Sequence, residues 1–205
     1  MNENPNCRLC SLWRSADSRS ICLKGAGGDS AKLFIFLDAP NIVEDKRHRG
    51  IVSDGVEWLK WALRRMSVSR QDVYVDYVLK CYPGRSKDFK KKALRAEMVE
   101  QCFHYRVATL QHVKPKAIVA MGRFACEALT GRSDKVKESE GTTWTPSEPA
   151  VREFVPHVWV SYSPAYVLQD MGESVGVFRV LWHAAVDAGL KPKLDGGVAP
   201  FDYGT

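Results

Sequence analysis

Residues 33–41 read LFIFLDAPN, and this stretch decides the fold class. The run Leu33–Leu37 is apolar without interruption, as expected for a parallel strand that is buried on both faces. The segment DAPN at residues 38–41 follows it directly and is a turn signal. The stretch therefore predicts a buried parallel strand that ends in a polar turn.

Three further apolar runs occur along the chain, and stretches with helical spacing separate them. The runs are VYVDYVL at residues 73–79, AIVAM at 117–121 and HVWVSY at 157–162. Helical spacing is found at residues 56–66, 99–110, 123–129 and 175–188. Residues 132–150 form a polar excursion. This α/β alternation predicts a three-layer α/β/α sandwich around a four-stranded parallel sheet.

The length of 205 residues fits one domain, which we assign to residues 1–190. Residues 191–205 are rich in glycine and proline and are expected to form a loosely held tail. No apolar run is long enough to span a bilayer, and the polar N-terminus does not resemble a signal peptide. We therefore expect a cytoplasmic monomer without membrane contact.

The formal net charge is +6, which fits a polyanion as the partner. The densest basic stretch precedes the predicted helix at residues 99–110. Its residues are Arg85, Lys87, Lys90, Lys91, Lys92 and Arg95. We interpret them as a patch that contacts phosphates, and the alternative is a solvated surface.

Four of the six cysteines form a pattern that indicates a metal centre. They are Cys7, Cys10, Cys81 and Cys102. The C-x-x-C pair offers two thiolates from one turn, and two distant cysteines complete a four-thiolate site if the fold joins them. This spacing favours an iron–sulfur cluster, while zinc, a disulfide and buried thiols remain open alternatives. Cys22 and Cys126 are interpreted as structural. Free thiols favour a reducing compartment.

Four segments are expected beyond the carboxyl ends of the strands, where sheets of this kind bind ligands. They are DAPN (38–41), YVLKC (77–81), MGR (121–123) and SPAY (163–166). In this order they resemble the motifs of family 4 uracil-DNA glycosylases, the iron–sulfur branch of that superfamily. Glu44 and Asp45 match the Glu-Asp that follows the family's first motif. The resemblance runs from Cys7 to about Leu181 and implies a 4Fe-4S cluster on the four cysteines.

Three positions depart from the family pattern. The asparagine that reads the uracil edge is Tyr77 here, the histidine of the final loop is Ser163, and the phenylalanine that stacks on the flipped base is Ile51. Loss of the amide removes hydrogen bonds that discriminate between bases. Loss of the histidine removes an electrostatic stabiliser, often worth about 2.7–4 kcal/mol. The altered base pocket is predicted to consist of Ala39, Pro40, Ile51, Tyr77 and Ser163.

Acidic groups of the first motif remain available for catalysis. We expect Asp38 to hold the attacking water or to stabilise an oxocarbenium-like sugar, with Asn41 and Glu44 assisting. The alternative is that these residues only form a turn. Arg123 and the final loop are expected to contact DNA, and one side chain of the loop to fill the gap left by a flipped base. The loop residues are Pro164, Ala165, Tyr166 and Leu168.

These features lead to three hypotheses about function. The first is a monofunctional DNA glycosylase that flips out a modified base and leaves an abasic site. Its candidate substrate is glucosylated hydroxymethylcytosine of phage DNA, which would make the protein an anti-phage enzyme. The second is excision of uracil in base excision repair. The third is an inactive glycosylase fold that serves as a DNA-binding accessory protein.

Overall fold

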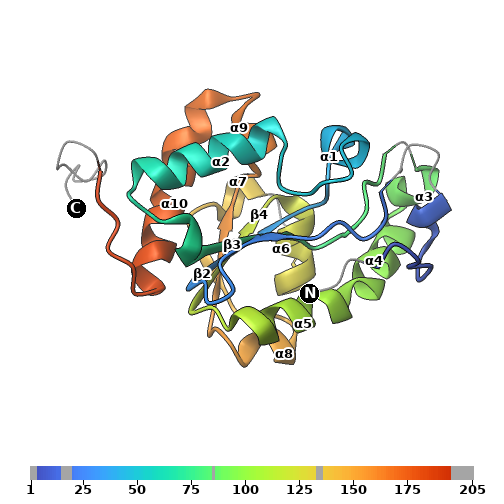
Figure 1. Ribbon diagram of the computed structural model, residues 1–205. Coiled ribbons are helices and arrows are strands. Elements are labelled where there is room, and N and C mark those ends of the chain that lie inside the picture. Colours follow the sequence, from blue (N-terminus) through green and yellow to red (C-terminus); the bar gives the residue numbers. More distant parts are fainter. Residues whose placement is uncertain (1–3, 15–19, 85, 133–135, 195–205) are drawn as a thin grey trace.

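The structure is a computed structural model, and it describes residues 4–14, 20–84, 86–132 and 136–194. Its centre is a six-stranded sheet in the order β1-β3-β2-β4-β6-β5 (Figure 1). The four inner strands are parallel: β2 (Leu33–Leu37), β3 (Val73–Tyr77), β4 (Ala117–Met121) and β6 (Val158–Ser161). The short strands β1 (Ala26–Gly27) and β5 (Thr143–Trp144) add an antiparallel edge on each side. The predicted parallel sheet is thus confirmed as the centre of a larger mixed sheet.

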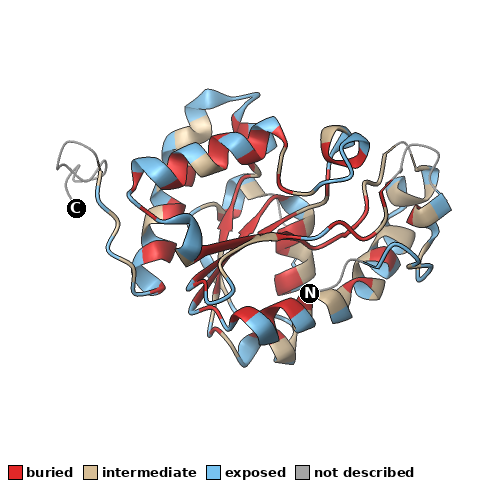
Figure 2. Cartoon of the chain, viewed as in Figure 1, coloured by how far each residue is buried: buried red, intermediate tan, exposed pale blue. Residues whose placement is uncertain are grey.

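Helices cover both faces of the sheet, which confirms the three-layer arrangement (Figure 1). The layer over one face contains α2 (Asp54–Arg65), α9 (Pro164–Val167) and α10 (Ser174–Asp187). The layer over the other face contains α5 (Phe103–Val113), α6 (Arg123–Thr130) and α8 (Pro149–Arg152). Along β2, Leu33 and Ile35 face the first layer and Phe34 and Phe36 face the second. Every residue of β2 is therefore buried, as Figure 2 shows in red.

Several shorter elements connect these layers. They are η1 (Ser11–Arg14), α1 (Ile42–Lys46), η2 (Arg70–Asp72), α3 (Lys87–Lys90), α4 (Lys92–Gln101), α7 (Val136–Ser139) and η3 (Met171–Glu173). The polar excursion predicted at residues 132–150 contains α7, β5 and the start of α8. Within the described residues, no helix is long and apolar enough to cross a membrane.

The single helix predicted around residues 99–110 is broken at Cys102 into α4 and α5. The N–H of Cys102 is shared between the carbonyl groups of Met98 at 3.3 Å and Val99 at 3.2 Å. The guanidinium of Arg106 also donates to the Val99 carbonyl, at 2.7 Å. This competition for one carbonyl ends α4 and leaves Cys102 buried at the junction.

The tail predicted to be loosely held begins with residues that are in fact bonded. The N–H of Lys193 donates to the carbonyl of Met66 at 2.9 Å, and Leu194 packs against the first core layer. The segment 191–194 therefore lies along the end of α2. Residues 195–205 of the predicted tail lie outside the described residues.

Candidate active site and thiol cluster

Asp38 follows β2 directly, at the carboxyl end of that central strand. Its Oδ1 accepts a hydrogen bond of 2.7 Å from the N–H of Ala125, in the first turn of α6. Desolvation raises the pKa of Asp38 to about 7, and the N–H groups of Ala125 and Phe124 offset only part of that rise. Such a carboxyl group exchanges protons near neutral pH, as a general base must.

Gly122 provides the space for this carboxyl group. It has a φ of +105° and immediately precedes α6. A Cβ atom added there would lie 2.5 Å from Asp38 Oδ2, which is closer than atoms approach without a shift. The sequence identifies Gly122 only as the start of a helix. The signal that could have revealed its second role is the pairing of β4 with β2, which places residue 122 next to residue 38.

Asn41 and Glu44 form a capping box at the start of α1. Asn41 Oδ1 accepts hydrogen bonds from the N–H groups of Val43 at 2.9 Å and Glu44 at 3.1 Å. Glu44 Oε2 accepts one from the N–H of Asn41 at 2.9 Å. Such a box satisfies N–H groups that a helix start leaves without partners. Both side chains thus shape the turn, and their roles in catalysis stay predictions.

Glu44 also forms the centre of a buried network, and only 1% of it is exposed. Its Oε1 accepts hydrogen bonds from the Tyr77 hydroxyl at 2.5 Å, Val52 N–H at 3.0 Å and Ser53 N–H at 3.3 Å. The carboxylate therefore ties the loop between α1 and α2 to the end of β3.

Tyr77 and Ile51, two residues of the predicted base pocket, are held together in this network. The Tyr77 hydroxyl accepts a hydrogen bond from the N–H of Ile51 at 2.7 Å while it donates to Glu44. Desolvation and the Glu44 charge raise the pKa of Tyr77, so its hydroxyl keeps the proton that it donates. Ile51 has a φ of +61°, an unfavourable value for a β-branched residue, and Lys60 holds its carbonyl at 2.9 Å. The Tyr77 ring is enclosed, so a base can stack on it only if this loop moves.

The other residues of the predicted pocket occupy different positions. Pro40 is buried, and Ala39 packs against an apolar cluster that also contains Cys81. Ser163 caps the start of α9, where its Oγ accepts a hydrogen bond from the N–H of Tyr166 at 3.2 Å. Ser163 therefore sits at a helix start, and its place beside a leaving base stays a prediction.

The final loop presents apolar side chains to solvent. Tyr166 is 39% exposed and Leu168 is 44% exposed. Pro164 and Ala165 pack against α2, since a Cβ added to Gly55 would meet Ala165 N at 3.0 Å. The loop is thus anchored on one side and free to contact a partner on the other, which suits the predicted insertion into DNA.

The basic stretch is exposed along α3 and the start of α4. Its described members are Lys87, Lys90, Lys91 and Lys92, and the predicted contact Arg85 lies outside the described residues. Arg123 is exposed at the first position of α6. Arg95 differs, because its guanidinium lies 4.8 Å from the centre of the Phe124 ring. The exposed cations are available to phosphates, and their contact with DNA stays a prediction.

The fold brings the cysteines of the predicted metal centre into one region. Cys10, Cys81 and Cys102 belong to an apolar cluster with Leu12, Leu79 and Met98. Burial raises the pKa of Cys10, and a smaller part of the rise comes from the neighbouring Cys7, so the fourth thiol lies nearby. None of the six cysteines forms a disulfide, which excludes that alternative in this structure.

The setting of these thiols fits a group that binds thiolates. Desolvation raises the pKa of Cys81 to about 12 and that of Cys102 to about 11. Thiolates at these positions therefore need a positive centre, which a metal cluster would supply. The N–H of Cys22 also donates to Cys81 Sγ at 3.3 Å, a common contact of cluster sulfurs. Across the described ranges, however, no three His, Cys, Asp or Glu side chains have the spacing of a metal site. The cluster therefore stays a prediction.

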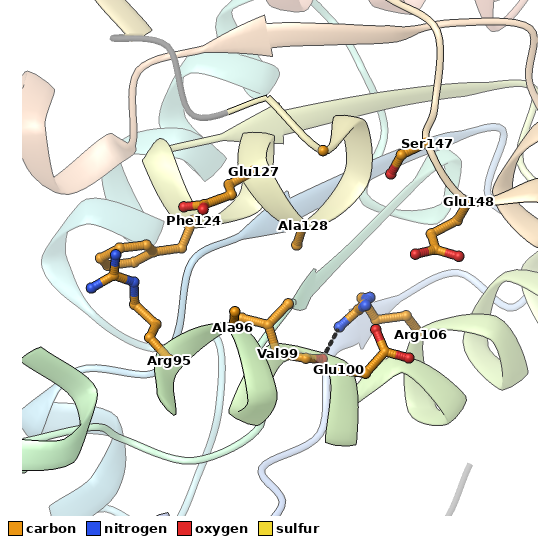
Figure 3. Close-up of a pocket in the computed structure, with 11 residues that line it drawn as sticks. Arg95, Ala96, Val99, Glu100, Arg106, Phe124, Glu127, Ala128, Ser147 and Glu148 are labelled. Atoms are coloured by element: carbon orange, nitrogen blue, oxygen red, sulfur yellow. Dashed lines mark hydrogen bonds between the residues drawn. The ribbon is translucent and has the colours of Figure 1, made fainter. Parts of the chain in front are cut away.

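Two of the cavities on the surface of the described chain are well formed, and neither of these two is lined by Asp38 or Tyr77. One, of about 180 Å³, lies between α4, α5 and α6, with Arg106 at one end and Arg95 at the other (Figure 3). The other, of about 360 Å³, lies between α2 and β1 and is lined in part by Ile51. The predicted base pocket therefore coincides with neither cavity.

A comparison of the sequence with models of protein families identifies the family of this chain. The model of the uracil DNA glycosylase superfamily matches residues 25–185, from the residue before β1 into α10. The chain belongs to the uracil DNA glycosylase superfamily. The resemblance noted in the sequence is thereby confirmed.

Curated relatives within the uracil DNA glycosylase superfamily are similar to this chain at low identity. The type-4 uracil-DNA glycosylase of Archaeoglobus fulgidus is 31% identical over 129 residues, covering 63% of this chain and 61% of that protein. The type-4 enzyme of Pyrobaculum aerophilum is 28% identical over 168 residues, 80% of each protein. That of Saccharolobus solfataricus is 24% identical over 141 residues, 68% of this chain and 62% of that protein. The chain thus spans less than two thirds of the Archaeoglobus and Saccharolobus proteins.

Proposed function

We propose that this superfamily member is a DNA glycosylase that hydrolyses an N-glycosidic bond and leaves an abasic site. The observation that carries the proposal is the placement of Asp38. Its carboxyl group has a pKa of about 7 and lies at the sheet edge where α/β folds bind their ligands. The names of the type-4 relatives support the same class of reaction.

In the proposed reaction the base leaves the duplex first, because its glycosidic bond is inaccessible within the stack. The ionised Asp38 then accepts a proton from the attacking water and stabilises positive charge on the sugar. The N–H of Ala125 fixes the orientation of this carboxylate. Lys80 is buried in an ion pair with Asp76, so its amine is not free to form a Schiff base. We therefore propose hydrolysis without strand cleavage.

We further propose that the base is a modified one, with glucosylated hydroxymethylcytosine as the candidate. The Tyr77 hydroxyl is engaged by Glu44 and Ile51, so it offers no donor–acceptor pair of the kind that reads uracil. Ile51 and Ser163 are smaller than the phenylalanine and histidine of the family pattern, so a pocket that opens between them by movement of the loop would admit a larger substituent. Uracil is the second candidate, because the relatives carry its name.

The test compares three duplexes that contain uracil, glucosylated hydroxymethylcytosine or only ordinary bases. Alkali cleaves each strand at abasic sites, and Asp38→Asn serves as the matched control. Cleavage of the glucosylated duplex alone supports the modified-base proposal, and cleavage of the uracil duplex alone replaces it by the second candidate. DNA binding without cleavage of any duplex would instead identify an accessory protein.

An anti-phage role is the biological form of this proposal. Phages with glucosylated DNA should plate less efficiently on cells that express the wild-type chain than on cells that express Asp38→Asn. Phages with unmodified DNA are the control and should plate equally on both strains. Equal plating of the glucosylated phages would exclude defence as the role.

We also propose a 4Fe-4S cluster held by Cys7, Cys10, Cys81 and Cys102. The group would supply a covalent connection between the N-terminal segment, the end of β3 and the α4–α5 junction, and thereby stabilise the fold. Protein purified without oxygen should be brown and contain iron. Cys81→Ala should lose both colour and iron, and Cys126→Ala should keep them. A colourless wild-type protein that contains stoichiometric zinc would contradict the assignment of an iron–sulfur cluster.

A further inference from the structure

The larger of the two cavities is a groove between α2 and the edge strand β1, which pairs with β3. Buried or half-buried apolar residues form its floor, and exposed or half-buried basic residues line its rim. The floor contains Ala26, Leu63, Val68, Val73 and Val75. The basic residues of the rim are Arg49, Lys60, Arg64 and Arg70. The groove therefore combines an apolar surface with a concentration of positive charge.

The three arginines of the rim have no counter-charge. In the part of the chain that the structure describes, Arg49, Arg64 and Arg70 make no side-chain hydrogen bond, ion pair or ring contact. Lys60 differs, because its Nζ lies 2.7 Å from Glu57 Oε1. That pair neutralises the carboxylate of the lining, so the arginines give the groove a net positive potential.

The arginines of the smaller cavity differ, because each already interacts with another residue of the protein. Arg95 lies over the Phe124 ring, and Arg106 donates to the Val99 carbonyl (Figure 3). Glu100 and Glu148 line the same cavity and lie near Arg106 in that view. Their negative charge opposes the entry of an anion. The two cavities both contain arginines, but only the groove presents them without partners.

We propose that the groove binds a nucleoside phosphate, either free or as part of a DNA strand. Arginine donates paired, charge-assisted hydrogen bonds to phosphate, and the aliphatic floor can cover the face of a base. The volume of about 360 Å³ falls within the range of small-molecule sites. Ile51 lines the groove and also belongs to the predicted base pocket, so a strand bound here would reach that pocket. Binding in the groove requires no excision and can therefore be measured separately from it.

The experiment titrates isotope-labelled protein with four probes: dTMP, thymidine, inorganic phosphate and a thymidine trinucleotide. Amide signals of Ala26, Gly27 and Val75 should shift with dTMP or with the trinucleotide. Thymidine and phosphate should each bind about tenfold more weakly, because each supplies only part of the contacts. A preference for dTMP assigns the groove to a free nucleotide, and a preference for the trinucleotide assigns it to a strand.

Two variants and a control show whether the arginines and the floor are responsible. The double variant R64E/R70E should weaken binding by about tenfold or more, since two charge-assisted hydrogen bonds are lost. Ala26→Trp should also weaken it, because the indole fills the groove without a change of charge. Lys114→Glu replaces one exposed cation by an anion at the end of α5, in the helical layer on the other face of the sheet. It should leave the affinity nearly unchanged.

Three results would overturn the proposal. The first is an unchanged affinity for dTMP in the R64E/R70E variant, provided that circular dichroism shows this variant to be folded. The second is binding of inorganic phosphate as tight as that of dTMP. The third is displacement of dTMP by a polyglutamate peptide as effective as displacement by the trinucleotide. The last two would mean that the groove is a general anion surface. Excision by the wild type is measured on the three duplexes described above, so failure of the groove and failure of the enzyme remain distinguishable.

Discussion

Asp38 and Glu44 are two carboxyl groups of the short segment that runs from the end of β2 into α1, and their surroundings differ. Asp38 accepts a hydrogen bond from the N–H of Ala125 at the start of α6. Glu44 accepts hydrogen bonds from three backbone N–H groups and from the Tyr77 hydroxyl. Glu44 is buried and Asp38 is half-buried, and desolvation dominates at Asp38 and raises its pKa to about 7.

The difference shows how the number of hydrogen-bond donors around a carboxylate affects its role, either to fix the backbone or to bind water and exchange a proton. A carboxylate surrounded by donors fixes the backbone around it and has few lone pairs left for a substrate. One with few donors keeps sites for water and titrates in the physiological range. The same sheet edge thus carries a titratable carboxyl group, which we propose as the general base, and a structural brace at the start of α1. The predictions below would break or sharpen this distinction.

The largest effect is expected for Asp38→Asn. The amide keeps the shape and can still accept the hydrogen bond from Ala125, but it cannot take a proton from water. Excision should fall by about 10²–10⁴-fold, the usual contribution of a general base. Single-turnover assays on the substrate that the wild type cleaves measure this, with DNA affinity as the control. Full activity in the variant would remove Asp38 from the mechanism.

The next effect is expected for Glu44→Ala, and it concerns stability. The substitution leaves several buried donors without an acceptor, each costing about 1–3 kcal/mol, so we expect a total loss of about 3 kcal/mol or more. Urea denaturation followed by circular dichroism measures the free energy of unfolding. Glu57→Ala, at an exposed position, is the matched control. If Asp38→Asn destabilises the protein as much as Glu44→Ala does, the distinction between brace and base fails.

The pH dependence of excision should reveal the state of Asp38. Below pH 7 the carboxyl group is protonated, so the rate should fall by about tenfold for each pH unit.

The raised pKa of Asp38 has the opposite effect on the stability of the fold. Between the ordinary aspartate pKa of 3.8 and the raised pKa of about 7, the folded state binds more protons than the unfolded state. This contribution is present at low pH and is lost as the pH rises through 7. Asp38→Asn should remove it, which pH-dependent denaturation will show.

Tyr77→Phe should have a smaller effect than Glu44→Ala. It removes one hydroxyl, while Glu44 keeps its three backbone donors. The expected loss of stability is about 1.5 kcal/mol, that of a hydrogen bond to a charged group. The Ile51 N–H also loses its acceptor, so protection of this amide from hydrogen exchange should decrease. Unchanged protection at Ile51 would show that the hydroxyl does not hold the loop.

The smallest effect is expected for three lysines of the basic stretch. Replacing Lys87, Lys90 and Lys91 by glutamine should make DNA binding less dependent on salt. Each lost phosphate contact reduces the slope of log K against log salt by about 0.9. Fluorescence anisotropy at several salt concentrations measures this slope. The same slope in wild type and variant would identify the stretch as a solvated surface.

Uninterrupted apolar runs made the four parallel strands readable from the sequence. The edge strands β1 and β5 contain two residues each, too few for any periodicity to appear. The break between α4 and α5 was missed because it depends on the Arg106 side chain, which lies beyond the broken turn. Propensity along the chain carries no information about that contact.

The candidate site was readable in its residue types but not in its bonds. Family motifs located Asp38, Glu44 and Tyr77, yet nothing in the sequence pairs the Tyr77 hydroxyl with a glutamate 33 positions away. The contact between Asp38 and Ala125 spans 87 positions. Each of these bonds forms only after the sheet has set the order of its strands, so local pattern cannot reveal it.

The apolar cluster around Leu12 has a consequence for the order of events during synthesis. Leu12 is 1% exposed and packs in one cluster with Leu79 and Met98. The N-terminal segment therefore cannot bury this side chain until α4 has left the ribosome. At a translation rate of about 5–20 residues per second, the delay is on the order of 4–20 seconds. During that time the N-terminal segment stays accessible to chaperones or iron donors, because the residues that bury Leu12 have not yet been synthesised.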